Sequence, residues 1–288
     1  MNNLFIVKDK GMYFYPLEEK CVCSTRETIS CRILKKIYTK LNIAFPAYII
    51  NTIVLDWIAN SQDVIVVTDS AFSISFVKFL KKKKVNMCLY FQNEITNENC
   101  YKMSFFDNIY TYDNVDAKKY GLKFMHYPYS GKVKKNNSTN YLYDVYFIGN
   151  AKDREPQILK LYGELKKAGL SVLFKVVGAE SKSIKSDKYV NYEENLKYIE
   201  QSKCLLDIND VNQHAPSIRY LESIFLEKKL ITTQTNIRTY KYFNPENTLV
   251  IDSDNYFDQL NDFIAKEYKE VETNFDNIDF HNWIDLFY

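Results

Sequence analysis

Long apolar runs are absent from this 288-residue sequence. The nearest one, over 43–58, is interrupted by Pro46, Asn51 and Asp56, so we expect no membrane-spanning helix. The apolar run that opens the chain is too short for a secretory signal and lacks a cleavage site. No Gly-x-Gly-x-x-Gly follows an apolar run, which disfavours a dinucleotide-dependent oxidoreductase. A nicotinamide-dependent absorbance change would restore that interpretation.

Glycine and proline are scarce, with 7 and 6 copies, whereas the chain holds 24 Tyr and 19 Phe. With so many aromatic residues, most must belong to the core, although rings near a binding site would suit sugar stacking. Hydrophobic residues make up 46% and charged residues 26%, as in ordinary soluble globular proteins. The length allows one large domain or two smaller ones.

The Cys-x-x-Cys motif is also missing. The six cysteines are scattered, and three of them fall within apolar periodic runs. We therefore expect reduced, mostly buried thiols in a cytoplasmic protein. Cys21 and Cys23 as half of a metal site are the alternative.

Charge is unevenly distributed along the chain. Residues 1–130 carry 17 Lys+Arg and 12 Asp+Glu, a balance of +5, so the remaining 21 and 24 give −3. This asymmetry fits a first half that faces an anionic surface, and a chance distribution of solvated charge explains it equally well. The four lysines at 81–84 end a predicted helix, where positive charge is favourable without any ligand.

The first half of the chain alternates apolar runs with segments of helical periodicity. Residues 63–68 (DVIVVT) are a β-branched run typical of a buried parallel strand. Further strands are predicted over 3–7, 85–91, 108–112 and 123–129, and helices over 32–41, 47–59, 70–84 and 115–120. This alternation predicts a parallel α/β sheet with crossover helices.

Residues 131–140 are polar apart from Val133, and a second α/β series follows them. Its predicted strands cover 144–148, 172–177, 204–208, 230–233 and 248–251, and its helices cover 154–168, 195–201, 218–226 and 257–270. The aromatic residues 280–288 predict a terminal helix. We thus expect doubly wound, Rossmann-like domains over 1–130 and 143–270, a linker over 131–142, and a segment over 271–288 that packs back on the first domain.

Ligands of open parallel sheets bind beyond the carboxyl ends of the strands. In the second series, Gly149, Asn150 and Arg154 follow the first strand and open a helix, which predicts a phosphate cradle. An ordinary βα turn with solvated charges is the alternative. Gly178 ends the second strand in the same way.

A dense polar cluster follows the strand predicted over 204–208, and a helix with charged residues comes next. These segments supply the remaining candidates for ligand contact: Asp207, Asn209, His214, Ser217, Arg219 and Glu222. Arg219 and Glu222 are one helical turn apart and share a face, so one can meet a phosphate and the other a diol. A surface ion pair is the alternative.

Three stretches of the second series resemble the donor domain of GT-B glycosyltransferases. SIRYLESIFLEKKLITT (217–233) resembles the helix signature R-x-x-E of that domain, and YDVYFIGNAKDR and FKVVG resemble its first two strand–loop units. Residues 106–130 resemble the end of the acceptor domain and its crossing to the donor domain. The resemblance covers most of the chain and points to transferases of bacterial lipopolysaccharide or capsule synthesis, with two Rossmann-like domains that face a central cleft.

The resemblance implies roles for particular residues. Glu222 matches the glutamate that binds the donor ribose, Arg219 matches a basic residue that faces the diphosphate, and Gly149 matches the glycine that lets the nucleotide approach. Arg154 is a further candidate contact to the diphosphate. His214 stands where many retaining members carry a second glutamate, which favours an inverting reaction or a different donor contact. Glu227 replaces the usual glycine of the signature, a helix-end detail.

GT-B enzymes generally need no metal, because helix dipoles and basic side chains neutralise the leaving diphosphate. We therefore expect no cofactor and no metal site. Asp252-Ser253-Asp254 matches the D-x-D motif of the other glycosyltransferase architecture, and such triplets also arise by chance.

An inverting transfer needs a base for the acceptor hydroxyl, usually from the first domain. Asp69 follows the strand over 63–68 and is our candidate, with a helix N-cap as its alternative role. Asp9 and Glu94 follow other strands in the same way. His126 is expected to be a buried or interdomain histidine.

The sequence thus predicts a metal-independent glycosyltransferase that moves a sugar from a UDP-type donor to a growing surface glycan. The expected partners are the nucleotide sugar and a glycan or lipid-linked oligosaccharide, with the inner leaflet of the cytoplasmic membrane as a candidate surface and no nucleic acid. The alternatives are a GT-B-like sugar-nucleotide epimerase and a non-catalytic glycan-assembly protein with a decayed donor site. Turnover of UDP-sugar without acceptor would indicate the former, and failure to bind nucleotides the latter.

Overall fold

The computed structural model describes residues 3–8, 22–24, 37, 40, 41, 64–130, 133, 140–210, 213–252, 256–270 and 275–288. The chain divides into two compact units. The first combines Met1–Ser130 with Phe275–Tyr288, and the second is Gly131–Asn274. Both are parallel α/β units, which confirms the predicted fold class at that level.

The first unit contains a parallel sheet with the strand order β2-β1-β3-β4-β5-β6. Its strands are β1 (Leu4–Val7), β2 (Val22–Ser24), β3 (Ile65–Thr68), β4 (Met87–Phe91), β5 (Asn108–Thr111) and β6 (Lys123–Phe124). The helices of this unit among the described residues are α3 (Ile74–Lys82), η1 (Cys100–Phe105), α4 (Asn114–Tyr120), α9 (Phe280–Trp283) and η4 (Ile284–Leu286).

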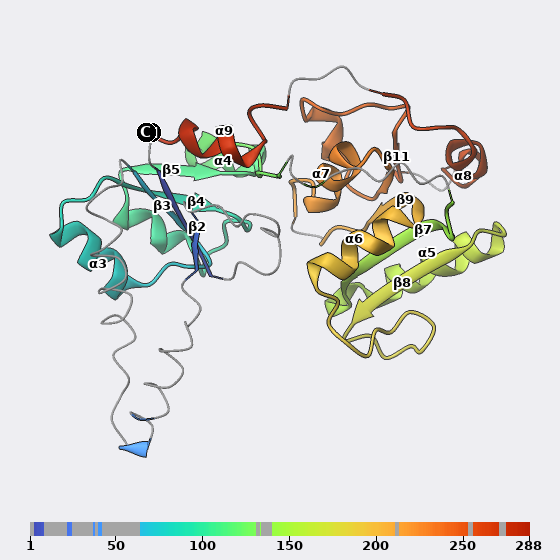
Figure 1. Ribbon diagram of the computed structural model, residues 1–288, viewed down its shortest axis with the longest axis horizontal. Coiled ribbons are helices and arrows are strands. Elements are labelled where there is room, and N and C mark those ends of the chain that lie inside the picture. Colours follow the sequence, from blue (N-terminus) through green and yellow to red (C-terminus); the bar gives the residue numbers. More distant parts are fainter. Residues whose placement is uncertain are drawn as a thin grey trace. The chain divides into compact units, whose positions relative to one another are not determined.

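The two faces of this sheet carry different side chains, because successive residues of a strand point to opposite sides. Leu4, Ile6 and their equivalents on β3 and β4 pack with Phe76 and Leu80 of α3. On the other face, Phe5 meets Trp283 of α9 at 5.2 Å between ring centroids. Figure 1 shows α9, in red, running alongside the strands near β5. Residues 275–288 therefore supply part of the first unit's core.

The second unit contains a parallel sheet with the strand order β11-β10-β9-β7-β8. Its strands are β7 (Tyr143–Asn150), β8 (Val172–Val177), β9 (Ser202–Asp207), β10 (Lys229–Thr232) and β11 (Thr248–Val250). Its helices are η2 (Lys152–Arg154), α5 (Glu155–Lys167), α6 (Tyr192–Glu200), α7 (Ile218–Phe225), η3 (Thr235–Thr239) and α8 (Tyr256–Ala265).

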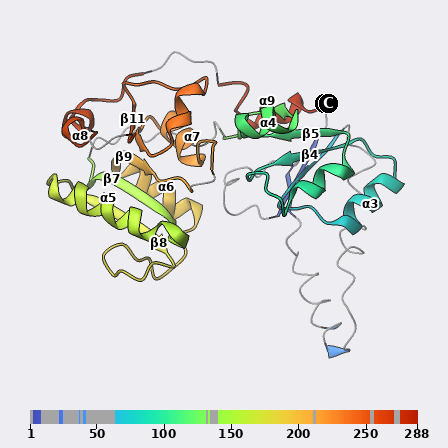
Figure 2. The same ribbon diagram turned by 180° about the vertical axis from the view of Figure 1, so that it is seen from behind.

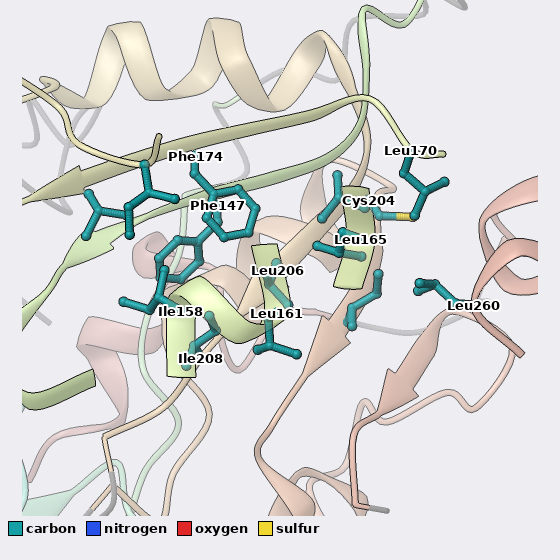
Figure 3. Close-up of a cluster of buried hydrophobic side chains, with 14 of the residues drawn as sticks. Phe147, Ile158, Leu161, Leu165, Leu170, Phe174, Cys204, Leu206, Ile208 and Leu260 are labelled. Carbon is teal, nitrogen blue, oxygen red and sulfur yellow. The ribbon is translucent and has the colours of Figure 1, made fainter. Parts of the chain in front are cut away.

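One face of the second sheet packs against α5 and α8 through a buried apolar cluster. Phe147 and Leu206 of the sheet meet Ile158 and Leu161 of α5, and Leu260 of α8 joins them (Figure 3). The view from behind shows α5 lying along β7 and β8 (Figure 2). The opposite face is covered by α6 and α7, which contact β9.

Both sheets share one connectivity. The first strand of each unit has the second strand on one side and the third on the other, so the chain reverses direction between β1 and β3 and between β7 and β9. Ligands of doubly wound sheets bind at such switch points, outside the carboxyl ends of the strands.

Several predicted elements differ from the structure in their bounds. The helix predicted over 70–84 is α3, which begins at Ile74 because Ser73 accepts a hydrogen bond from the Phe76 amide at 3.2 Å. The strand predicted over 123–129 is only the two residues of β6. The terminal helix over 280–288 is two short pieces, α9 and η4. The helices predicted over 32–41 and 47–59 lie almost wholly outside the described residues.

Among the described residues, no helix is both long enough and apolar enough to cross a bilayer. Cys88, Cys100 and Cys204 are free thiols, and the first and last of these are buried. Burial raises the pKa of Cys204 to about 12. Cys21 lies outside the described residues, so the alternative metal half-site stays a prediction.

Candidate functional site

The switch point of the second sheet is spanned by Arg154. This residue precedes α5, where the chain leaves β7. Its guanidinium donates to the carbonyl of Ile208, just beyond β9, and to the carbonyl of Asn150 at 2.9 Å, at the end of β7. One cation therefore joins the two strand ends between which a ligand of this fold is expected.

A second guanidinium, that of Arg219, lies at the same edge. Arg219 is in the first turn of α7, behind the N-cap Ser217, whose hydroxyl accepts from the Arg219 amide at 3.2 Å. Its side chain donates to the carbonyl of Ile148 on β7 and stacks over the ring of Phe147, 5.5 Å from the centroid. Asp207 is its ionic partner at 3.7 Å.

Arg219 lies close enough to Arg154 to affect the pKa of Arg154. Burial lowers the pKa of Arg154, and the positive charge of Arg219 lowers it further, against the opposing effect of Asp210 and Asp207. The Nε atoms of both arginines are buried and have no hydrogen-bond partner among the described residues. Lys152 adds a third cation, 3.8 Å from Asp210. An anion placed here would relieve the repulsion between like charges.

Asp207 and Asn209 are buried at the carboxyl edge of the second sheet and connect its elements by side-chain hydrogen bonds. Asp207 is fully buried and accepts from the hydroxyls of Ser217 at 2.6 Å and Thr232 at 3.2 Å. Asn209 donates from its side chain to the carbonyl of Ala215 at 3.1 Å. Their bonds join β9 to β10 and to the start of α7, and so fix the position of Arg219.

Glu222 is buried beneath the same edge, with only 2% of its surface exposed. Its carboxylate accepts from the Asn195 amide at 3.0 Å, and Asn195 in turn accepts from the Tyr146 hydroxyl at 2.9 Å. Burial raises the pKa of Glu222, against the opposing effects of Arg219 and of a hydrogen bond from Tyr192. The side chain thus belongs to an interior polar network that links β7, α6 and α7.

The other predicted contact residues are more exposed. Gly149 lies in β7, where an added Cβ would stand 3.0 Å from the Phe147 ring. Asn150, Gly178 and His214 are exposed, and Gly178 has φ +77°, which favours glycine. Their positions at the ends of β7 and β8 and before α7 bring them to one edge of the sheet.

One interaction at this edge was missed from the sequence. The carboxylate of Glu155, in the first turn of α5, accepts from the amides of Glu180 and Ser181 at 3.0 Å. It ties the loop after β8 to the start of α5. Acidic residues are common in the first turn of a helix, so no sequence signal distinguishes this one.

No group of His, Cys, Asp or Glu in the described part of the chain could hold a metal ion. Asp252, the first member of the D-x-D triplet, pairs with Arg238 at 2.7 Å. Asp254 lies outside the described residues.

Asp69 lies at the switch point of the first sheet, directly after β3. It is 4% exposed, and both of its carboxylate oxygens accept hydrogen bonds at 2.8 Å, one from the Gln92 amide and the other from the Asn93 side chain. Burial raises its pKa, although these hydrogen bonds oppose the shift. Asp69 does not cap α3, because Ser73 does.

The other candidate bases are placed differently. Asp9 lies outside the described residues. Glu94 follows β4, and its backbone carbonyl accepts from Asn99 at 2.8 Å. His126 is half-buried: its carbonyl accepts from the Trp283 indole at 2.8 Å, and its ring stands edge-on to Phe124.

A layer of uncharged side chains lies beside Asp69, and no sequence pattern points to it. Ser70 donates to the Gln92 side chain at 3.4 Å, and Gln92 donates to the Tyr127 hydroxyl at 3.3 Å. Tyr127 stands edge-on to Tyr112, with 5.8 Å between ring centroids. Residues that follow β3 and β4 thus meet a residue from the segment after β6.

These features define an α/β protein with two parallel sheets of the same strand order and a basic edge on the second. No family model matches the chain, and no curated protein matches it. Among solved structures, it is similar to the glycosylation associate protein (Gap123) complex from Streptococcus agalactiae, with 13% identity over 75% of this chain and a TM-score of 0.44. The chain spans 50% of that protein's length.

A second likeness is to the transcription regulator CcpA of Lactococcus lactis. It has 13% identity and covers 94% of this chain and 93% of the regulator, with a TM-score of 0.23. Neither likeness is close enough to identify an activity.

Proposed function

We propose that the chain is a nucleotide-sugar glycosyltransferase of GT-B architecture and that the carboxyl edge of the second sheet binds the diphosphate of the donor. The paired guanidinium groups of Arg154 and Arg219 at the switch point are the observation that supports this function best. A diphosphate carries the charge and the oxygen acceptors that two neighbouring guanidinium groups require.

The same groups would assist the reaction as well as binding. Negative charge develops on the diphosphate as the bond to the sugar breaks, and fixed cations lower the energy of that state. Arg154, Arg219 and the start of α5 are the proposed source of this stabilisation, so the mechanism needs no resident metal or cofactor. The proposed donor is a UDP-type sugar, as the resemblance of the 217–233 segment implies.

The remaining residues receive proposed roles that follow from their exposure. The nucleotide would contact Gly149, Asn150, Gly178 and Ser217, and the sugar would contact His214. Asp207 and Asn209 would act from beneath, by holding Arg219 and the strand ends. Glu222 stays the proposed ribose contact of the resemblance, and it would have to become accessible to serve.

Asp69 stays the proposed base for the acceptor hydroxyl. Its oxygens are engaged by Gln92 and Asn93, so it could accept a proton only by exchanging one of those bonds for a bond from the acceptor. The proposed acceptor is a glycan or a lipid-linked oligosaccharide. The exposed lysines 81–84 at the end of α3 would suit the anionic inner leaflet.

The donor site is tested by calorimetric titration with UDP. We expect Arg154→Ala to weaken UDP binding about tenfold to a hundredfold, because a charge-assisted hydrogen bond contributes about 1.5–3 kcal/mol. Arg219→Lys should also weaken it, because lysine keeps the charge but loses the planar fork. Arg238→Ala is the matched control, since Arg238 is half-exposed and pairs with Asp252. If the wild type and the three variants bound UDP with equal affinity, Arg154 and Arg219 would not be part of the donor site.

A non-catalytic glycan-assembly protein is the second candidate, and the engaged carboxylate of Asp69 favours it. Such a protein, whose donor site has decayed, would not turn over UDP-sugars. An assay of sugar release and of transfer, with and without added oligosaccharide, separates the two functions. Turnover that Arg154→Ala abolishes would exclude the non-catalytic function.

A further inference from the structure

The carboxyl edge of the first sheet carries a hydrogen-bonded layer that the proposed donor site does not use. It consists of Ser70, Gln92 and Tyr127, which are all partly exposed. Thr68 continues the layer inward, because its hydroxyl lies 3.1 Å from that of Ser70 and donates to the Ile6 carbonyl at 3.0 Å. The layer therefore crosses the switch point between β1 and β3, where a ligand of this sheet is expected.

The bonds at this edge fall into two groups of different length. Asp69 is buried and holds the Gln92 amide and the Asn93 side chain at 2.8 Å each. The bonds from Ser70 to Gln92 and from Gln92 to Tyr127 are 3.4 and 3.3 Å. Hydrogen bonds near 3.4 Å are long and weak. Asp69 thus fixes the backbone at Gln92, while the long bonds above it can be exchanged for bonds to a ligand.

The exchangeable layer has no formal charge. Lys102, a nearby cation, is engaged: it donates to the backbone carbonyl of Asp69 at 3.0 Å and lies 5.9 Å from the centre of the Phe72 ring. A hydroxyl, an amide and a phenol offer both donors and acceptors, which matches hydroxyl groups rather than phosphates. The basic edge of the second sheet has the opposite character, although the strand order is the same.

Tyr127 also offers a ring. Its edge-on contact with Tyr112 fixes the ring plane, and a fixed aromatic ring beside an amide and a hydroxyl suits a ligand with both C–H and O–H groups. We propose that Ser70, Gln92 and Tyr127 form a binding site for a neutral carbohydrate.

The proposal that a carbohydrate binds at this site does not depend on the proposed donor site. Only its further role as the acceptor side of a transferase rests on the proposed function. Carbohydrate binding is therefore measured without nucleotide, so that a failure of UDP binding and a failure of this site give different results.

Saturation-transfer difference NMR tests the site, with the methyl glycosides of glucose, galactose and N-acetylglucosamine as separate probes. We expect at least one probe to receive saturation from the wild-type chain. Gln92→Ala and Tyr127→Phe should each weaken its binding about fivefold, because each variant removes one hydrogen bond, worth about 1 kcal/mol. Gln92→Ala keeps the backbone bond to Asp69, and Tyr127→Phe keeps the ring, so both variants should stay folded.

Two matched variants provide the controls. Gln259→Ala removes an exposed glutamine of α8, and Tyr101→Phe removes the hydroxyl of an exposed tyrosine of η1. Both should bind the glycoside like the wild type, and calorimetry should show unchanged UDP affinity in Gln92→Ala. The proposal is overturned if none of the probes receives saturation, or if all the variants bind the glycoside as tightly as the wild type.

Discussion

Glu222 lies in the interior of the second unit, where its carboxylate is buried and bonded to Asn195. The resemblance to the GT-B signature would instead place this residue at the ribose of a donor. Among the described residues Glu222 has no ion pair within 4 Å, and a buried carboxylate without one is costly in its charged form. The effect of Glu222 on stability should therefore depend on pH.

We expect Glu222→Gln to stabilise the second unit at neutral pH. The pKa of Glu222 is raised above its usual value of 4.5 in the folded chain, so the wild type is fully stabilised below that pH and loses stability as pH rises through the raised pKa. Glutamine carries no charge and avoids this loss. Chemical denaturation at several pH values measures the difference, with the exposed Glu193→Gln as control.

If the difference in stability between Glu222→Gln and the wild type did not change with pH, the buried charge would not be its cause. Calorimetry with UDP on the same variant addresses the ribose role separately. A tenfold loss of affinity without a change in stability would favour the ribose contact of the resemblance.

The sequence predicts which residues reach the basic edge better than it predicts which way they point. Arg154 and Arg219 could be expected there, because one follows a strand and the other opens a helix. The three-residue spacing of Arg219 and Glu222 places them on one face, but it does not say that Glu222 lies deeper, against Asn195 of another helix. The same limit applies to Asp69, whose partners Gln92 and Asn93 come from the loop that follows β4.

At the scale of elements, α9 and the residues that follow it form a short segment with large buried side chains. Trp283, Phe280 and Phe287 are almost completely buried. Trp283 meets Tyr90 and Phe287 at 5.1 and 4.7 Å between ring centroids, and Asn3 donates to the carbonyl of Ile284 at 2.9 Å. A helix of four residues has little stability of its own, so this packing must hold it in place.

Trp283→Ala should therefore destabilise the first unit by about 3–5 kcal/mol, the usual cost of truncating a large buried aromatic residue. Urea denaturation followed by circular dichroism measures this loss. Leu286→Ala is the matched control on the neighbouring η4, because Leu286 is 37% exposed. If the two variants lost equal stability, the aromatic packing would not be what anchors the segment.

Elements with a strong local signal were predicted closely, and those that depend on distant partners were not. β8 covers the predicted 172–177, because its apolar β-branched run is bounded by clear turn residues. β2 was missed, since its three residues become a strand only by pairing with β1. The strand predicted over 123–129 ends at Phe124, and Tyr129 donates instead to the carbonyl of Ile278 at 2.7 Å.

At the scale of the whole molecule, two units with the same connectivity present edges of different chemistry. The second offers guanidinium groups, and the first offers neutral amide and hydroxyl groups. A nucleotide should therefore act on one unit and leave the other unchanged.

Hydrogen exchange with and without saturating UDP tests this selectivity. We expect slower exchange at the ends of β7 and β9 and in the first turn of α7, because a ligand that binds only the folded unit stabilises it. Exchange in β3 and β4 should not change. Protection in both units, or protection that persists in Arg154→Ala, would contradict a donor site confined to the second edge.

Residues 275–288 belong to the first unit although they follow the second unit in the sequence. This order affects how the chain folds during synthesis. Domains generally fold as units during synthesis, starting from the N-terminal end. Here Trp283 and Phe287, which pack on the aromatic face of the first sheet, are translated only after all of 131–274. The second unit can thus be complete before Phe5 and Tyr90 gain their contacts with Trp283.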